Sequence, residues 1–262
     1  MTGKVVVFGI DGVRLDTLRA TDTPHLDAIA HAGFLTKLRI PDENPTISGP
    51  CWATIASGVL SSVHKIKGNQ LAGNMLADHP CFLARAADEG FSTYGAAGWL
   101  PLLTSQQDGP IFRPHKQYTP PRPPGAKTGG DSISDGLVAD EAAKTLQHTD
   151  VDAAFVYFGQ ADEVGHEHGT GDAYAQAVRN ADECVGQVMA AIAQRPQFDT
   201  ETWTYIAVTD HGHRDGGGHG GDSDLERTAW IIASGPGIGA HSGAGLNHAD
   251  IPSLVKAGLD AP

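Results

Sequence analysis

The stretch Lys4–Ile10, KVVVFGI, followed directly by Asp11-Gly12, decides the fold class. It is a short, continuous run of apolar and β-branched residues, which is typical of a strand buried on both faces of a parallel sheet. The Asp-Gly pair ends the run, because both residues favour turns. We therefore expect Asp11 to lie at the carboxyl end of a buried strand.

Outward from this strand, helical and strand-like segments alternate along the chain. Thr23-Pro24 predicts a helix through Ala32, with Thr23 as its N-cap and Gly33 as its stop signal. The alternation predicts an α/β fold, a three-layer sandwich with helices on both faces of a mainly parallel central sheet. Further helices are expected at Pro50–Ser57, Cys81–Glu89, Asp135–Gln147 and Asp172–Gln194, and strands at Phe34–Ile40, Thr93–Ala97, Asp152–Phe158, Thr202–Thr209 and Ala229–Ser234.

The length of 262 residues suits one domain of this class, so we expect residues 1–262 to form a single unit. One segment departs from the alternation. Residues 101–134 are rich in proline and glycine and hold few apolar residues, which predicts an irregular excursion. Such an excursion either covers a site or forms inert surface.

The composition excludes several classes of protein. The chain has 18 Lys and Arg against 31 Asp and Glu, a net charge of −13, which disfavours binding to nucleic-acid polymers and to anionic membranes. The three cysteines, Cys51, Cys81 and Cys184, show no CxxC spacing and are expected to be reduced thiols. The apolar run at the N-terminus is too short for a signal peptide, and no stretch approaches the ~18 apolar residues of a membrane span. We therefore expect a cytoplasmic location.

Aspartate and histidine gather directly after three of the expected strands. Ligands of open α/β sheets bind beyond the carboxyl ends of the strands, so these residues are candidates for a common site. Carboxylate and imidazole together suit zinc, and Asp162 and His166 are four residues apart, which places both on one face of a helical turn. Glycines 216–218 allow the tight turn that would return His219 to the cluster. The candidates are Asp11, Asp162, His166, Asp210, His211 and His219, with His168 and His213 as alternative ligands or as groups that support the ligands.

Ser48 is the candidate nucleophile. It stands before Gly49-Pro50 and the apolar helical pattern that follows. In one interpretation its hydroxyl only caps that helix. In the other, a metal ion lowers the pKa of the hydroxyl and the oxygen attacks a phosphorus or sulfur centre held at the helix N-terminus. The residues alone leave both interpretations open.

Seven segments together resemble the alkaline phosphatase superfamily, and within it the type I phosphodiesterase/nucleotide pyrophosphatase branch. They are distributed along nearly the whole chain: VVVFGIDGVRLDTL, TPHLDAIAHAG, NPTISGPCWATIASGV, SSVHKIKGN, YFGQADEVGHEHG, VTDHGHRDGGGHGG and HADIPSLVKAGL. The resemblance implies two divalent metal ions. Zinc is the expected metal for both, and manganese is the alternative. The resemblance assigns Asp11, Asp210, His211 and Ser48 to one ion and Asp162, His166 and His219 to the other.

The resemblance also implies a substrate class and a mechanism. Ser48 would be the catalytic nucleophile, and Asn69 with the backbone amide of Gly49 would hold a phosphate oxygen. Lys65 stands where the family has a glycine before this asparagine. The expected substrate is a small, nucleotide-like phosphodiester or pyrophosphate, cleaved through a phosphoseryl intermediate. The sequence leaves the natural substrate and the oligomeric state open.

Three alternatives are weighed against this function. A phosphomonoesterase would use Lys65 or Lys67 to bind the additional phosphate charge. A sulfatase would need a CxPSR motif, and Cys51 is followed by Trp52, Ala53 and Thr54. A metal-binding module without turnover would leave an intact Ser48 without a role. We expect the phosphodiesterase function, with the phosphomonoesterase as the alternative.

Overall fold

Strand β1 (Gly3–Ile10) lies inside the sheet, as its apolar sequence predicts. All eight of its residues are buried, and it pairs in parallel with β5 (Ala153–Phe158) on one side and β6 (Thr202–Val208) on the other. Because both faces of the strand are covered, alternate side chains enter two separate hydrophobic cores. Val5 and Val7 enter one core, and Val6, Phe8 and Ile10 enter the other.

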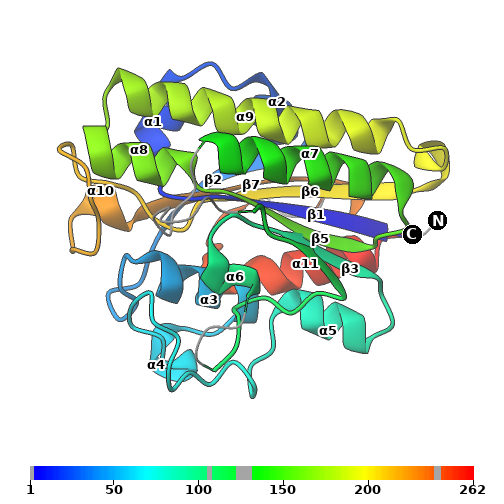
Figure 1. Ribbon diagram of the computed structural model, residues 1–262, viewed down its shortest axis with the longest axis horizontal. Coiled ribbons are helices and arrows are strands. Elements are labelled where there is room, and N and C mark those ends of the chain that lie inside the picture. The colour runs from blue at the N-terminus through cyan, green and yellow to red at the C-terminus, as the bar shows by residue number, and fades with distance from the viewer. Residues whose placement is uncertain (1–2, 105–107, 122–131, 239–242) are drawn as a thin grey trace.

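The computed structural model describes residues 3–104, 108–121, 132–238 and 243–262, and these form a three-layer α/β sandwich (Figure 1). The central layer is a seven-stranded sheet in the order β2-β7-β6-β1-β5-β3-β4. It is mainly parallel, which confirms the predicted fold class. The remaining strands are β2 (Phe34–Arg39), β3 (Thr93–Ala96), β4 (Lys116–Tyr118) and β7 (Thr228–Ser234).

Helices cover both faces of the sheet (Figure 1). One layer holds α1 (Leu15–Ala20), α2 (Pro24–Ala32), α7 (Ser132–His148), α8 (Gln160–His168) and α9 (Asp172–Ala193). The opposite layer holds α3 (Ser48–Ser57), α4 (Ser61–His64), α5 (Phe82–Asp88), α6 (Leu100–Leu103) and α11 (Ile251–Leu259). The short α10 (Asp224–Arg227) and 3-10 turns at Phe198–Thr200, Pro236–Ile238 and His248–Asp250 complete the described elements. Among the helices of the described ranges, none is both long and apolar enough to span a bilayer.

The segment predicted to be an irregular excursion is more regular than its prolines suggest. Helix α6 begins it, and β4 pairs in parallel with β3 at the edge of the sheet. Ile111 and Phe112 between them are buried in the core that contains Phe155. The prediction was therefore wrong for these elements, because a few apolar residues among prolines were enough to anchor the segment. The tip, residues 122–131, lies outside the described residues.

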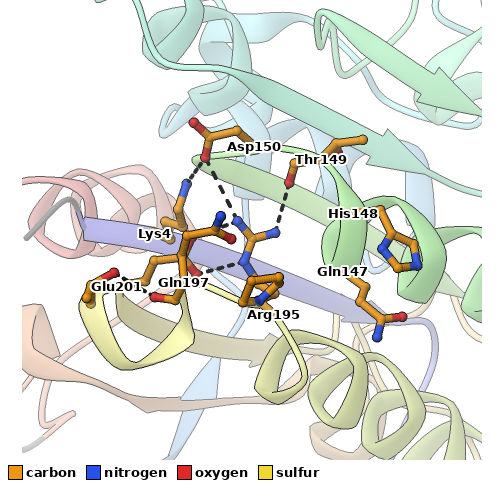
Figure 2. Close-up of a pocket in the computed structure, with 10 residues that line it drawn as sticks. Lys4, Gln147, His148, Thr149, Asp150, Arg195, Gln197 and Glu201 are labelled. Carbon is orange, nitrogen blue, oxygen red and sulfur yellow. Dashed lines mark hydrogen bonds and ion pairs between the residues drawn. The ribbon is translucent and has the colours of Figure 1, made fainter.

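A buried ion-pair network closes the amino ends of the central strands. It lines a cavity of about 460 Å³, in which Figure 2 shows Lys4 and Arg195 beside Asp150. The Lys4 ammonium donates to Asp150 at 2.6 Å and to Asp152 at 3.0 Å. The Arg195 guanidinium binds both oxygens of Glu201, at 2.6 and 2.7 Å, and also donates to the carbonyl oxygens of Leu146 and Thr149. Protein acceptors therefore occupy both cations, and the network joins the starts of β1, β5 and β6.

Replacing Arg195 with methionine is expected to lower the free energy of unfolding by about 3–5 kcal/mol, because it leaves the buried Glu201 carboxylate without its cationic partner and with the Trp203 indole as its remaining donor. The two side chains are only 3% and 6% exposed. The measurement is urea denaturation, with Arg179→Met in α9, the helix that precedes Arg195, as a matched control expected to change stability by less than about 0.5 kcal/mol. A loss below about 1 kcal/mol for Arg195→Met would show that the pair does not stabilise the fold.

Candidate active site

A small cavity of about 140 Å³ lies at the carboxyl ends of β1 and β5, at the opposite end of the sheet from the ion-pair network. Five of the predicted metal ligands are in its wall. Asp210 and His211, which follow β6, are fully buried beside it. The structure therefore brings all seven predicted metal ligands together. The residues lining the cavity are Asp11, Ser48, Asn69, Trp99, Tyr157, Gly159, Asp162, Glu163, His166 and His219.

The first donor group consists of Asp11, Asp210 and His211, whose ligand atoms all lie within 4.8 Å of one another. Nε2 of His211 is 3.2 Å from Oδ2 of Asp210 and 3.6 Å from Oδ1 of Asp11. Nδ1 of the same ring lies 3.2 Å from the carbonyl oxygen of Gly212. A proton on Nδ1 leaves the lone pair of Nε2 directed at the two carboxylates, which is the arrangement of a metal-binding histidine.

Protein donors hold one oxygen of each carboxylate, and the other oxygen accepts no hydrogen bond from the described residues. Oδ2 of Asp11 accepts hydrogen bonds from the Trp52 indole at 2.9 Å and the Tyr157 hydroxyl at 2.7 Å. Oδ1 of Asp210 accepts two backbone N–H groups, each at 3.0 Å. Oδ1 of Asp11 and Oδ2 of Asp210 are buried without a hydrogen bond. Such oxygens are costly to bury alone, so the arrangement fits a cation that binds both.

The electrostatics agree with a cation at this position. Burial raises the pKa of Asp11 to about 8, and the negative charge of Asp162 adds to that effect. Burial likewise raises the pKa of Asp210 well above its usual range and lowers that of His211 well below its usual range. Without a counter-ion, the folded protein thus disfavours the charged forms of both carboxyls. A divalent cation would favour those charged forms, with His211 as a neutral ligand.

The second donor group consists of Asp162, His166 and His219. Asp162 and His166 share one face of α8, as their spacing predicts, and Nε2 of His166 lies 3.5 Å from Oδ2 of Asp162. Nε2 of His219 lies 3.0 Å from Nε2 of His166 and 3.4 Å from Oδ1 of Asp162. Nδ1 of His219 donates to the carbonyl oxygen of Thr46 at 2.8 Å, so its Nε2 lone pair is free for a ligand role.

The glycines before His219 make the turn that the sequence suggests. Gly217 and Gly218 have φ angles of +85° and +78°, which side chains rarely adopt. A Cβ atom on Gly217 would lie 2.1 Å from the carbonyl oxygen of Gly165 in α8. The turn therefore packs tightly against the helix that carries Asp162 and His166, and it brings His219 to them.

Ser48 is the first residue of α3, and its hydroxyl does not cap the helix. The N-cap is Ile47, and no side-chain capping bond forms there. The interpretation of Ser48 as a simple cap is therefore wrong. Its Oγ lies 3.3 Å from Nε2 of His211, on the cavity side of the first donor group. The nucleophile candidate thus lies beside the cation position, at the end of a helix whose N–H groups attract anions.

Asn69 lies against the backbone that follows Ser48. Its Oδ1 accepts the N–H of Gly49 at 2.9 Å. A Cβ atom on Gly49 would lie 2.3 Å from the carbonyl oxygen of Gly68, so only glycine permits this approach. The contact leaves the Asn69 NH₂ group as a donor at the cavity wall. The Gly49 N–H itself becomes available to a phosphate oxygen only if Asn69 moves or its amide turns.

Lys65 has a left-handed backbone conformation that glycine adopts more easily. It has a φ of +66° and follows the last residue of α4. The turn forms with lysine at this position, and Asn69 reaches Gly49. The Lys65 and Lys67 ammonium groups donate to the Ser62 carbonyl and the Ser61 hydroxyl, and neither residue lines the cavity. The structure gives no support for either lysine as a phosphate ligand.

Lys65→Gly is expected to raise the free energy of unfolding by about 0.5–1 kcal/mol, because it removes the steric cost of a left-handed backbone conformation. Lys67 does not have a positive φ, so Lys67→Gly is the matched control and is expected to destabilise the fold. Chemical denaturation of both variants tests this. Destabilisation by both glycines to the same extent would rule out strain at Lys65.

The sequence did not identify two residues that orient Asp11. Trp52 was interpreted as part of an apolar helical pattern, and Tyr157 as part of a buried strand. Trp52 follows Ser48 by one helical turn, so it shares a face with the nucleophile, and this spacing was the available signal. Of the two additional histidines, His168 is exposed beside Glu167, whereas His213 is buried against Asp162.

Comparison with known proteins connects this geometry to a family. The human ectonucleotide pyrophosphatase/phosphodiesterase family member 7 is 24% identical over 223 residues, which is 80% of this chain and 47% of that protein. The chain thus spans about half the length of the curated relatives it matches. Murine ectonucleotide pyrophosphatase/phosphodiesterase 5, solved in an inactive form with AMP, superposes with a TM-score of 0.60 at 19% identity over 80% of this chain and 57% of that one. A 2-O GAG sulfatase superposes with a TM-score of 0.73 at 14% identity, over 100% of this chain and 72% of that one.

The two solved structures support the fold alone, because their sequence identity is low. The family assignment rests on a sequence profile that covers most of the chain. The profile described as type I phosphodiesterase / nucleotide pyrophosphatase matches residues 5–231, the part that contains every candidate ligand and Ser48. Proteins of this family typically bind metal ions and act on phosphate esters, in agreement with the two donor groups. The chain belongs to the type I phosphodiesterase/nucleotide pyrophosphatase family of hydrolases.

Proposed function

We propose that this protein is a dizinc hydrolase that cleaves the phosphodiester or pyrophosphate bond of a small, nucleotide-like substrate through a phosphoseryl intermediate. The observation that carries the proposal is the position of Ser48. Its Oγ lies 3.3 Å from Nε2 of His211, beside two buried carboxylate oxygens that accept no hydrogen bond from the described part of the chain. A hydroxyl in this place is next to a cation site and open to the cavity, as a nucleophile has to be.

The proposed ligands are Asp11, Asp210, His211 and Ser48 for one ion and Asp162, His166 and His219 for the other. When bound, the two ions would lower the pKa of the Ser48 hydroxyl and stabilise negative charge on the phosphate oxygens. Carboxylate and imidazole ligands are typical of zinc sites, and manganese sites also contain them.

The protein's own groups then position the substrate. The N-terminus of α3 presents a partial positive charge to a phosphate beside Ser48. The Asn69 NH₂ group donates to a phosphate oxygen without adding charge. Trp52 and Tyr157 hold Asp11 in one orientation, so the first donor group is preformed before substrate arrives.

Charge balance favours a diester over a monoester. Three aspartates and an ionised Ser48 hydroxyl carry four negative charges, which two divalent ions neutralise. In the described part of the chain, no lysine or arginine lines the cavity, and Glu163 adds a carboxylate to its wall. A singly charged diester therefore meets less repulsion than a doubly charged monoester.

The test compares two chromogenic substrates with zinc-reconstituted protein. We expect faster hydrolysis of bis-p-nitrophenyl phosphate than of p-nitrophenyl phosphate, with kcat/KM as the measured quantity. A clear preference for the monoester would contradict the proposal and favour the phosphomonoesterase. Nucleotide and nucleotide-sugar libraries would then narrow the substrate of a confirmed diesterase.

A further inference from the structure

His213 is a buried histidine of the site that the proposed mechanism does not use. Its side chain is fully buried, and its Nε2 lies 2.9 Å from Oδ1 of Asp162. Nδ1 of the same ring is buried without a hydrogen bond in the described structure. A carboxylate oxygen only accepts, so a proton on Nε2 satisfies the Asp162 contact. The bond therefore runs from His213 as donor to the Asp162 carboxylate as acceptor.

The ring fits a narrow slot between two elements of the site. A Cβ atom on Gly12, in the turn after β1, would lie 2.7 Å from Nε2 of His213, and one on Gly165, in α8, would lie 2.8 Å from Cε1. Tyr174 contacts the ring from α9, with the ring centroids 5.8 Å apart. The slot holds the ring in one place, so its hydrogen bond has a fixed direction.

This hydrogen bond fixes the orientation of the Asp162 carboxylate. Oδ1 accepts the His213 bond and lies 3.4 Å from Nε2 of His219, while Oδ2 lies 3.5 Å from Nε2 of His166. The oriented carboxylate thus faces both histidines of the second donor group.

We infer that His213 is a positioning residue for the second ion: its Nε2–H holds Oδ1 of Asp162, so that the carboxylate is oriented to bind the ion together with His166 and His219. The inference rests on the proposed two-ion site. It distinguishes His213 from a ligand, because a ring whose Nε2 carries the proton cannot use that atom to bind a metal. Groups that hold a ligand in this way typically change metal affinity by about 10–100-fold when they are replaced.

The test is a zinc titration of metal-free protein against a chromophoric chelator, which reads zinc affinity without using turnover. The wild-type protein is expected to bind two ions, and His219→Ala identifies the step that belongs to the second donor group. His213→Leu should weaken that step by about 10–100-fold, leave the other step unchanged and still bind two ions at saturating zinc. His213→Gln, whose side-chain amide can donate to Oδ1, should restore most of the affinity.

Two further variants make the result specific. Gly165→Ala keeps His213 but places a methyl group 2.8 Å from its ring, so it should also weaken the second step, and it tests the inference if His213→Leu does not fold. His168→Phe, an exposed position on the same helix, is the matched control and should change neither step.

Three results would overturn the inference. Loss of one ion from His213→Leu at saturating zinc would make His213 a ligand. Unchanged affinity of the second step in both His213→Leu and Gly165→Ala would show that the hydrogen bond does not position Asp162. Fewer than two ions in the wild-type protein would remove the proposed site itself, and the inference with it.

Discussion

Ser48→Ala is expected to lower the rate of diester hydrolysis on the order of 10⁴-fold or more, while the protein still binds two zinc ions at saturation. The substitution removes the oxygen that would form the proposed phosphoseryl intermediate. Asp11, Asp210 and His211 still surround the first cation position, so the metal is retained. Initial rates with bis-p-nitrophenyl phosphate and elemental analysis of the same sample measure the two effects together.

A second serine of the same helix provides the matched control. Ser57 is buried at the far end of α3, and its hydroxyl donates to the Ala53 carbonyl at 2.6 Å. Ser57→Ala should leave the rate within about twofold of wild type, since this type of bond contributes little to a helix. A loss below about tenfold in Ser48→Ala would exclude Ser48 as the nucleophile. Loss of zinc together with activity would indicate that it acts mainly as a metal ligand.

Asp210→Asn is expected to lower the activity and the zinc content of the zinc-loaded protein and to raise the stability of the metal-free protein. Asparagine keeps Oδ1, which accepts two backbone N–H groups, and replaces Oδ2, which has no partner, with a neutral NH₂ group. The first ion loses a charged ligand, so activity should fall by several orders of magnitude and zinc content from two ions to one. The second donor group is untouched and keeps its ion.

The metal-free variant should be more stable than the metal-free wild type at pH 8, by at least about 3 °C in Tm. Burial raises the pKa of Asp210 well above its ordinary value of 3.8, so above that pH the folded protein binds more protons than the unfolded chain. Stability of the metal-free wild type therefore falls as the pH rises from about 4 towards 8. The Asp210→Asn variant lacks this carboxyl, so its stability does not include the decrease with pH that Asp210 causes. Thermal melts from pH 5 to 9, with and without chelator, test the prediction.

Asp182→Asn is the control for replacing a buried carboxyl far from the site. Asp182 lies on α9 and accepts the backbone N–H groups of His25 and Leu26, one on each oxygen. Asparagine can satisfy only one of them, so this variant should be less stable and should still bind two zinc ions. Stabilisation by Asp182→Asn, or no change in zinc content for Asp210→Asn, would contradict the proposed role of Asp210.

Sequence patterns were sufficient for the order of the main elements but not for the direction of β7. The strand was expected from Ala229–Ser234, yet it runs antiparallel to β6 and β2. The connection from β6 carries Asp210, His211 and His219, and its helix α10 has only four residues. No long crossover helix is present in it to return the chain for a parallel strand. The direction of β7 depends on how the loop between β6 and β7 packs. The periodicity of the sequence does not encode that packing.

The candidate ligands were predictable for a simple geometrical reason. The carboxyl ends of parallel strands meet at one edge of the sheet, so polar residues directly after β1, β5 and β6 converge there. The partners of these ligands were not predictable in the same way. Trp52 and His213 reach Asp11 and Asp162 across different elements, and each contact depends on where a side chain points.

The burial of helix α3 has a consequence for protein engineering. All ten of its residues, from Ser48 to Ser57, are buried, so every substitution in the helix is also a change to the hydrophobic core. A library that randomised this segment would lose most members to misfolding before selection for a new substrate began. Directed evolution of specificity should keep the helix constant and diversify Asn69, Trp99 and Glu163 in the cavity wall.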